Sequence, residues 1–249
     1  MILVFCAFGA ELGSLRQLLS DIQPLTRRGL RGFQGFVGGS QVALIATGIG
    51  TRRARQAARL AFDCFKDVQW MVTTGVAGAL DAALPIGRVV VADRLMLRRD
   101  DEFELDTEIE APVHCRERAG AALGAAPAPF VIGPILTSSQ VIAKAADKKR
   151  AYEALGAIAV DMESAIIALE ATSRGLPFLC LRTIMDTASE EIVTPYLGDE
   201  NGPIKPFTVA GALMTQPRLA IASVRLLWNL RTATRSLREA MAAVLKTDL

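Results

Sequence analysis

The sequence predicts an α/β fold in which a largely parallel or mixed sheet is covered by helices. Short apolar runs alternate with longer polar segments of helical periodicity, an order typical of βα units. Hydrophobic residues make up 51% of the 249 residues and charged residues 22%, which is enough apolar material for strands buried on both faces. Folds of this class and length often form one domain, so we expect a single domain over residues 1–249.

The apolar runs give the expected strands. Residues 1–8 are apolar but too short for a signal peptide or a membrane span, and they predict a buried first strand. Further strands are expected at 42–46, 70–74, 89–92, 130–136, 157–160 and 178–183. The clearest helices are 53–65 and 163–174, and the second should end at Gly175.

Charge and cysteine content exclude several classes of protein. The formal net charge of +2 is too small for a nucleic-acid-binding protein, which usually concentrates many more Lys and Arg side chains on one face. The cysteines are widely spaced and contain no C-x-x-C pair, so neither a zinc site nor a disulfide scaffold is indicated. We expect a cytoplasmic protein, and the lone histidine, His114, is assigned no role.

Two glycine-containing segments follow predicted strands. Thr47-Gly-Ile-Gly50 opens a predicted helix, where backbone N–H groups can approach a phosphate or ribose oxygens. Thr73-Thr-Gly-Val-Ala-Gly78 repeats the pattern after the next strand and predicts a second loop at a shared site. Ordinary strand-to-helix turns are the alternative for both. Arg53 stands where a dinucleotide motif has its third glycine, so a nucleotide cofactor is not indicated.

Acidic residues at predicted strand ends are the candidates for catalysis. Asp161 is an expected helix N-cap, and Glu163 in the first turn should stay ionised and accept ribose hydroxyl hydrogen bonds beside Met162; simple capping is the alternative. Asp186 ends a long apolar run, where desolvation would make it a usable general acid. A helix cap or a partner for Arg182 is the other interpretation. Glu11 could orient a water molecule or be a surface glutamate of a helix.

Four segments, taken in this order, resemble the signatures of the nucleoside phosphorylase and methylthioadenosine/adenosylhomocysteine nucleosidase superfamily. They are VALIATGIG at 42–50, TGVAG with PIGRVV at 74–78 and 85–90, VDMES at 160–164 and RTIMD at 182–186. The resemblance implies a three-layer α-β-α phosphorylase-like fold, cleavage of the N-glycosidic bond of a nucleoside, a homo-oligomer, and no metal or cofactor.

The resemblance also implies roles for individual residues. Met162 and Glu163 would bind ribose, and Asp186 would protonate or hydrogen-bond purine N7, which favours a purine and specifically an adenine nucleoside. The base would be contacted near Val141 and Ile142. The rest of the pocket would be lined by Ile49, Ala77 and Gly78.

The nucleophile is left open between water and inorganic phosphate. In the hydrolytic branch a glutamate that matches Glu11 acts with water. In the phosphorylase branch phosphate is a co-substrate, which arginines and glycine-rich backbone hold. The residues of this chain that would take that role are Gly48, Gly50, Thr74 and Arg52.

A C-terminal helical extension is expected from about residue 211. Apolar residues recur in it at helical spacing: Val224, Leu227, Leu230, Leu237, Met241 and Val244. Its stripe would pack on the body or on a partner subunit; alternatively, with its arginines, the helix would lie on an anionic membrane surface. This tail, with residues 175–178 and 194–207, resembles the hopanoid-associated phosphorylase branch, which removes adenine from an adenosylated hopanoid.

Two other classes of function remain as alternatives. A non-catalytic nucleoside-binding protein would keep Met162 and Glu163 but would have little use for Asp186 and Glu11 at the same sheet edge. A peripheral membrane protein would use the C-terminal helix and leave the pocket inert.

Overall fold

The computed structural model describes residues 1–98, 105–192 and 217–247, with backbone only for 217–223. Its strands are β1 (Ile2–Cys6), β2 (Ser20–Leu25), β3 (Arg31–Val37), β4 (Ser40–Ala46), β5 (Trp70–Ala79), β6 (Val89–Arg98), β7 (Thr107–Glu110), β8 (Phe130–Ser138), β9 (Ala159–Asp161) and β10 (Phe178–Asp186). Its helices are α1 (Gly9–Arg16), α2 (Thr51–Cys64), α3 (Val113–Gly124), α4 (Ala145–Leu155), α5 (Ser164–Thr172) and α7 (Pro217–Lys246).

The strands form one mixed sheet, in the order β10-β6-β8-β9-β5-β1-β4-β3-β2, with β7 paired to β6. Strand β5 is parallel to both β1 and β10 and antiparallel to β9. Because β10 pairs with β5 as well as with β6, the strands β5, β10, β6, β8 and β9 close into a ring. The mixed sheet was predicted, whereas this closure was not.

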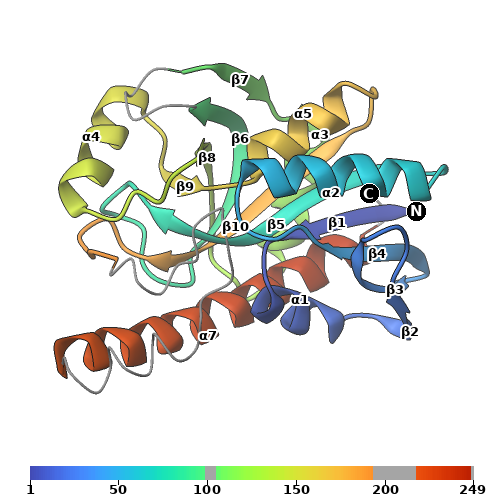
Figure 1. Cartoon of the computed structure of the whole chain (residues 1–249), viewed down its shortest axis with the longest axis horizontal. Helices are drawn as coiled ribbons and strands as arrows, with labels where there is room; N and C mark the ends of the chain where they lie inside the picture. Colours follow the sequence, from blue (N-terminus) through green and yellow to red (C-terminus); the bar gives the residue numbers. More distant parts are fainter. Residues whose placement is uncertain (99–104, 193–216, 248–249) are drawn as a thin grey trace.

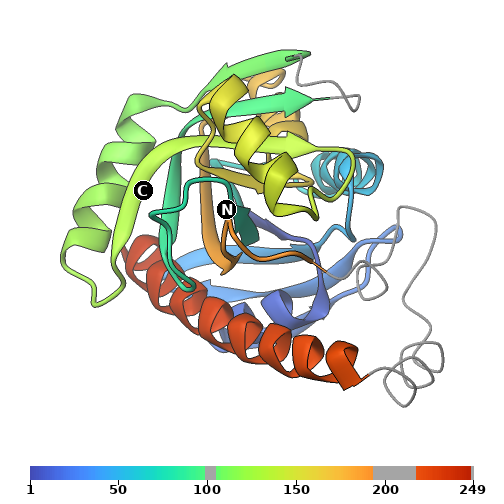
Figure 2. The ribbon, with the colours of Figure 1, turned by 90° about the vertical axis from the view of Figure 1, so that its left-hand side faces the viewer.

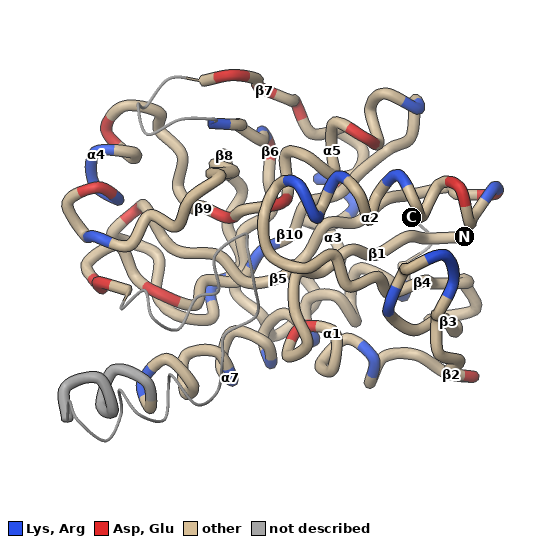
Figure 3. Tube along the Cα trace, in the orientation of Figure 1, with Lys and Arg blue, Asp and Glu red and all other residues tan. Residues whose placement is uncertain are grey.

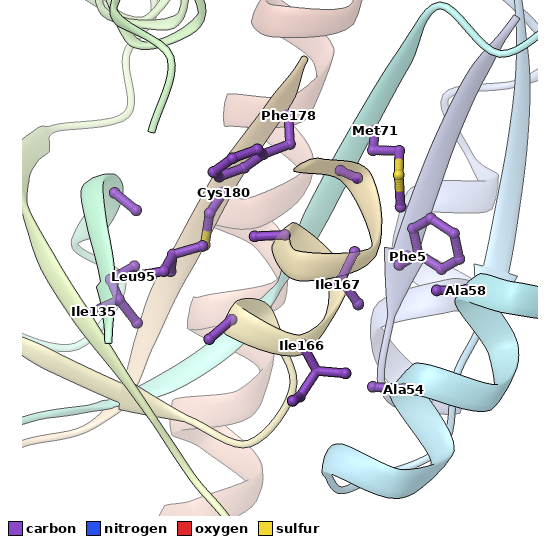
Figure 4. Packing of buried hydrophobic residues seen from close by; sticks show 14 of the residues in the cluster. Phe5, Ala54, Ala58, Met71, Leu95, Ile135, Ile166, Ile167, Phe178 and Cys180 are labelled. Atoms are coloured by element: carbon purple, nitrogen blue, oxygen red, sulfur yellow. The ribbon is translucent and has the colours of Figure 1, made fainter. Parts of the chain in front are cut away.

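Helices cover both faces of the sheet, which confirms the predicted three-layer fold (Figures 1 and 2). Successive side chains of a strand point to opposite faces, and the side chains of β1 are divided between the two faces in this way. Leu3 and Phe5 pack in the cluster that includes α2 and α5, whereas Val4 and Cys6 pack in the cluster that includes α1, α3 and α7. Figure 4 shows the first cluster, where α2 places alanines such as Ala54 against the sheet.

The segment 73–78 is part of a strand, so the prediction of a second glycine loop is wrong. Strand β5 continues to Ala79 because β10 pairs with it as far as Gly78. The glycines provide room here. A Cβ atom on Gly75 would lie 2.4 Å from Oε1 of Glu11, and one on Gly78 would lie 2.9 Å from Oδ2 of Asp186. Both glycines therefore let carboxyl groups lie against the strand.

The two halves of helix α7 differ in how deeply their apolar side chains are buried. The C-terminal half packs under the sheet through Leu237, Met241 and Val244, as the helical spacing predicts. In the N-terminal half, Val224 and Leu227 are exposed. No helix in the described ranges is both long enough and apolar enough to cross a membrane. The segments 99–104, 193–216 and 248–249, which include the tail's start near 211 and all of 194–207, lie outside the described residues.

Candidate active site

The parallel strands β1, β4 and β10 end at one edge of the sheet, where ligands bind in open α/β folds. A cavity of about 540 Å³ opens there. The residues that line it include nine expected at the site from the sequence: Glu11, Ile49, Ala77, Gly78, Val141, Ile142, Met162, Glu163 and Asp186. The tertiary structure thus gathers segments that are up to 175 residues apart in the chain, counted from Glu11 to Asp186.

Glu11 is fully buried on α1, so the alternative of a surface glutamate is wrong. Its Oε2 accepts hydrogen bonds from the backbone N–H groups of Ala7 and Phe8 at 2.7 and 3.2 Å, and its Oε1 accepts one from Val76 at 2.7 Å. Burial raises the pKa of Glu11, while Arg182 and these three N–H groups lower it. The carboxyl group is therefore fixed at the cavity wall with a proton affinity above the ordinary value, which suits a general base.

Glu163 is the N-cap of α5, one position before the expected first turn. Its Oε1 accepts a hydrogen bond from the backbone N–H of Gly50 at 2.8 Å. Burial raises its pKa to about 7, against the lowering effect of Arg182, and the nearby Asp161 raises it further. Desolvation therefore opposes the ionisation that the helix start was expected to favour, and Arg182 supplies the counter-charge.

Asp161 ends β9 and connects the helix start to a buried arginine. Its Oδ1 accepts the backbone N–H groups of Glu163 and Ser164 at 3.3 Å each, so it caps α5 from outside the helix. Its Oδ2 lies 2.8 Å from Nε of Arg182. Arg182 also lies 3.7 Å from Glu163. The guanidinium of Arg182 therefore forms ion pairs with both Asp161 and Glu163, and it also lowers the pKa of Glu11.

Asp186 is buried at the end of β10, and its partner is Lys148 rather than Arg182 as considered from the sequence. Nζ of Lys148 lies 2.5 Å from Oδ2 of Asp186. Burial raises the pKa of Asp186, Lys148 lowers it, and Glu190 raises it again. A carboxyl group with a raised pKa at the wall of an apolar cavity has the properties of a general acid.

The residues considered for phosphate do not line this cavity. Arg52 is exposed on α2 and lines a separate cavity of about 530 Å³ with Arg55 and Arg59. Figure 3 shows the basic residues along α2. The N–H of Gly50 is occupied by Glu163. Thr74 is buried within β5, and Gly48 lies against the side chain of Arg53. His114 lies elsewhere, 6.0 Å from the ring of Trp70.

Several lining residues were not expected from the sequence. Phe8 and Met185 flank the carboxylates, and Ile192, Leu226, Leu227 and Leu230 form an apolar side of the cavity. Lys148 has no sequence signal, because it belongs to a charged run, Asp147-Lys-Lys-Arg150, that is typical of a solvated helix face. The tertiary contact between Lys148 and Asp186, at the end of β10, is what brings it to the site.

Relatives of known name share sequence similarity with this chain. The chain is 28% identical over 207 residues to a 5′-methylthioadenosine/S-adenosylhomocysteine nucleosidase of Colwellia psychrerythraea, covering 74% of this chain and 83% of the relative. It is 29% identical over 220 residues to the enzyme of the same name in Mycobacterium bovis, covering 76% of this chain and 86% of the relative.

Solved structures share the fold. The 5′-methylthioadenosine/S-adenosylhomocysteine nucleosidase of Neisseria meningitidis, in complex with methylthio-immucillin-A, superposes with a TM-score of 0.78 at 19% identity, covering 99% and 98% of the two chains. A futalosine hydrolase mutant of Helicobacter pylori has the same TM-score and identity, covering 98% of this chain and 97% of its own. The model of the family described as "Phosphorylase superfamily" matches residues 1–201. The chain belongs to the phosphorylase superfamily.

Proposed function

We propose that this enzyme hydrolyses the N-glycosidic bond of an adenine nucleoside that carries an apolar 5′ substituent. The observation that carries the proposal is that Glu11, Glu163 and Asp186 line a single cavity with Met162. The named relatives are methylthioadenosine/adenosylhomocysteine nucleosidases, which supports a purine nucleoside as substrate.

Each carboxyl group has one task in the proposed mechanism. Cleavage builds positive charge on the sugar and negative charge on the leaving base. Asp186 gives its proton to the purine and relieves the negative charge. Ionised Glu163 accepts ribose hydroxyl hydrogen bonds, with Met162 against the sugar. Glu11 orients water and takes its proton as the C1′–O bond forms.

Water is favoured over phosphate by the composition of the cavity. Glu11 lies at its wall, whereas Arg52 lines another cavity and the N–H of Gly50 is engaged by Glu163. A phosphate dianion needs cationic or N–H donors, and a water molecule needs one base and a fixed position. Inorganic phosphate is therefore not required in the proposed reaction.

A second candidate substrate is an adenosylated hopanoid, in line with the resemblance of the tail to the hopanoid-associated branch. The observation that favours it is the apolar side of the cavity, which α7 supplies through Leu226, Leu227 and Leu230. Such a wall suits a bulky hydrocarbon better than the amino-acid tail of adenosylhomocysteine.

The test is adenine release by the purified protein from adenosine, methylthioadenosine and a 5′-alkyl adenosine, each with and without phosphate. Release without phosphate, fastest for the 5′-alkyl compound, is the expected result. Release only in the presence of phosphate would overturn hydrolysis and leave a phosphorylase. Absence of release from all three would favour a non-catalytic nucleoside-binding or peripheral membrane protein.

A further inference from the structure

Lys148 is a completely buried lysine behind the site. Its Nζ donates to Oδ2 of Asp186 at 2.5 Å and to the carbonyl oxygens of Thr187 and Glu190 at 2.8 and 3.0 Å. An ammonium group has three protons, and these three acceptors use them all. A buried charge is costly unless it is fully paired, and the three acceptors pair the ammonium group of Lys148 completely.

We propose that Lys148 is a positioning residue that fixes the carboxyl group of Asp186 and stabilises the negative charge left on it after proton transfer to the purine. This inference rests on the proposed function, in which Asp186 is the general acid. The proton passes from Asp186 to the base, the electron pair of the glycosidic bond leaves with the base, and Lys148 keeps its own protons throughout.

The geometry leaves one carboxyl oxygen of Asp186 for the substrate. Oδ2 accepts the hydrogen bond from Lys148, and the glycine at position 78 lets the carboxyl group lie against β5. We therefore assign Oδ1 to the purine. A carboxyl group fixed through Oδ2 loses little rotational freedom when the substrate binds, which favours catalysis by orientation.

The charges around Asp186 come from three elements. Lys148 belongs to α4, and Glu190 follows β10 and accepts the N–H of Thr187 at 2.9 Å. Arg225 of α7 pairs with Glu190 at 3.2 Å. Burial and Glu190 raise the pKa of Asp186, and Lys148 opposes them. Without Lys148 the opposing cation is gone, so Asp186 would keep its proton to higher pH and be a weaker acid.

The experiment compares Lys148→Met with Lys149→Met, since Lys149 is the exposed neighbour on the same helix and pairs with Glu153 at 3.7 Å. We expect Lys148→Met to lower kcat at least about tenfold, less than the ~10²–10⁴-fold that removal of a general acid costs. The basic limb of the kcat profile should move to higher pH, while KM changes little. Lys149→Met should match the wild type in kcat, in KM and in the position of the basic limb.

A purely structural role predicts a different outcome. Lys148 also holds the carbonyls of Thr187 and Glu190, close to Ile192 at the cavity wall. If it only tethered this segment, Lys148→Met would raise KM, leave the pH profile in place, and cost as much in an Asp186→Asn background as in the wild type. That result would overturn the proposal. Near-complete loss of the Lys148 effect in the Asp186→Asn background supports it.

Two further measurements keep the proposal testable. If Lys148→Met does not fold, Lys148→Gln retains amide donors without the charge and should show the same shift of the basic limb. Adenine affinity, measured by calorimetry across pH, is independent of turnover. If the wild type releases no adenine, the proposed function fails. The Lys148–Asp186 coupling is still supported if Lys148→Gln loses adenine affinity at a higher pH than the wild type does. It is overturned if both proteins lose adenine affinity at the same pH.

Discussion

The guanidinium of Arg182 lies 2.8 Å from the carboxylate of Asp161, and each of these side chains is 1% exposed. The same guanidinium lies 3.7 Å from Glu163. Asp161 and Glu163 raise the pKa of Arg182 although burial lowers it. A single buried cation therefore compensates several carboxylates beneath the cavity, and the stability of the site depends on it.

Replacement of Arg182 by Met should strongly destabilise the protein, because it leaves buried carboxylates without a counter-charge. We expect the free energy of unfolding in urea to fall by about 3–5 kcal/mol. Arg235→Met is the control, since its pair with Glu239 is largely exposed on α7 and should contribute about 0.5 kcal/mol or less. A loss in Arg182→Met no larger than in the control would contradict this role.

Stability should depend on pH through Glu163. Its pKa is about 7 in the folded protein against 4.5 for the ordinary side chain, so the folded state binds more protons than the unfolded state between these values. The free energy of unfolding therefore falls as pH rises across that window, by about 1–3 kcal/mol. Glu163→Gln removes this titration, and urea unfolding from pH 4 to 8 should show a flatter profile; identical profiles would disprove the assignment.

Gly75 should not tolerate a side chain. A Cβ atom there would lie 2.4 Å from Glu11 and 2.5 Å from Arg182, at a φ of +149°. We expect Gly75→Ala to destabilise the protein by about 2–4 kcal/mol and to lower adenine release by displacing Glu11. Gly13→Ala on α1, where a Cβ atom meets nothing within 4 Å, should keep activity and stability. Equal behaviour of the two variants would be inconsistent with the tight contact.

The apolar side of the cavity should determine substrate choice. Leu230→Ser places a hydroxyl group where we expect hydrocarbon, so kcat/KM for a 5′-alkyl adenosine should fall about tenfold or more relative to adenosine. Val224→Ser alters an exposed residue of the same helix that does not line the cavity, and its substrate ratio should remain that of the wild type. A parallel fall for both substrates in Leu230→Ser would argue against an apolar 5′ subsite.

Short apolar runs predicted the main strands, because a strand buried on both faces leaves a continuous run of apolar residues in the chain. The run at 178–183 is part of β10, and 53–65 overlaps α2. Strand β2 gives no such pattern, since five of its six residues are exposed. The end of β5 was interpreted as a loop because its glycines suggest turns, whereas their cause is the space needed by Glu11 and Asp186.

The sequence by itself determined the α/β class, the family, and a set of residues that line one cavity, because strand ends and motif order are properties of local sequence. The tertiary structure decided the pairing of charges. Asp186 meets Lys148 and Arg182 meets Asp161 across 38 and 21 residues of chain, because the fold brings α4 to the end of β10 and because β5 pairs with both β9 and β10. Such pairings, and the desolvation that sets the pKa of Glu163, depend on long-range packing that no local pattern records.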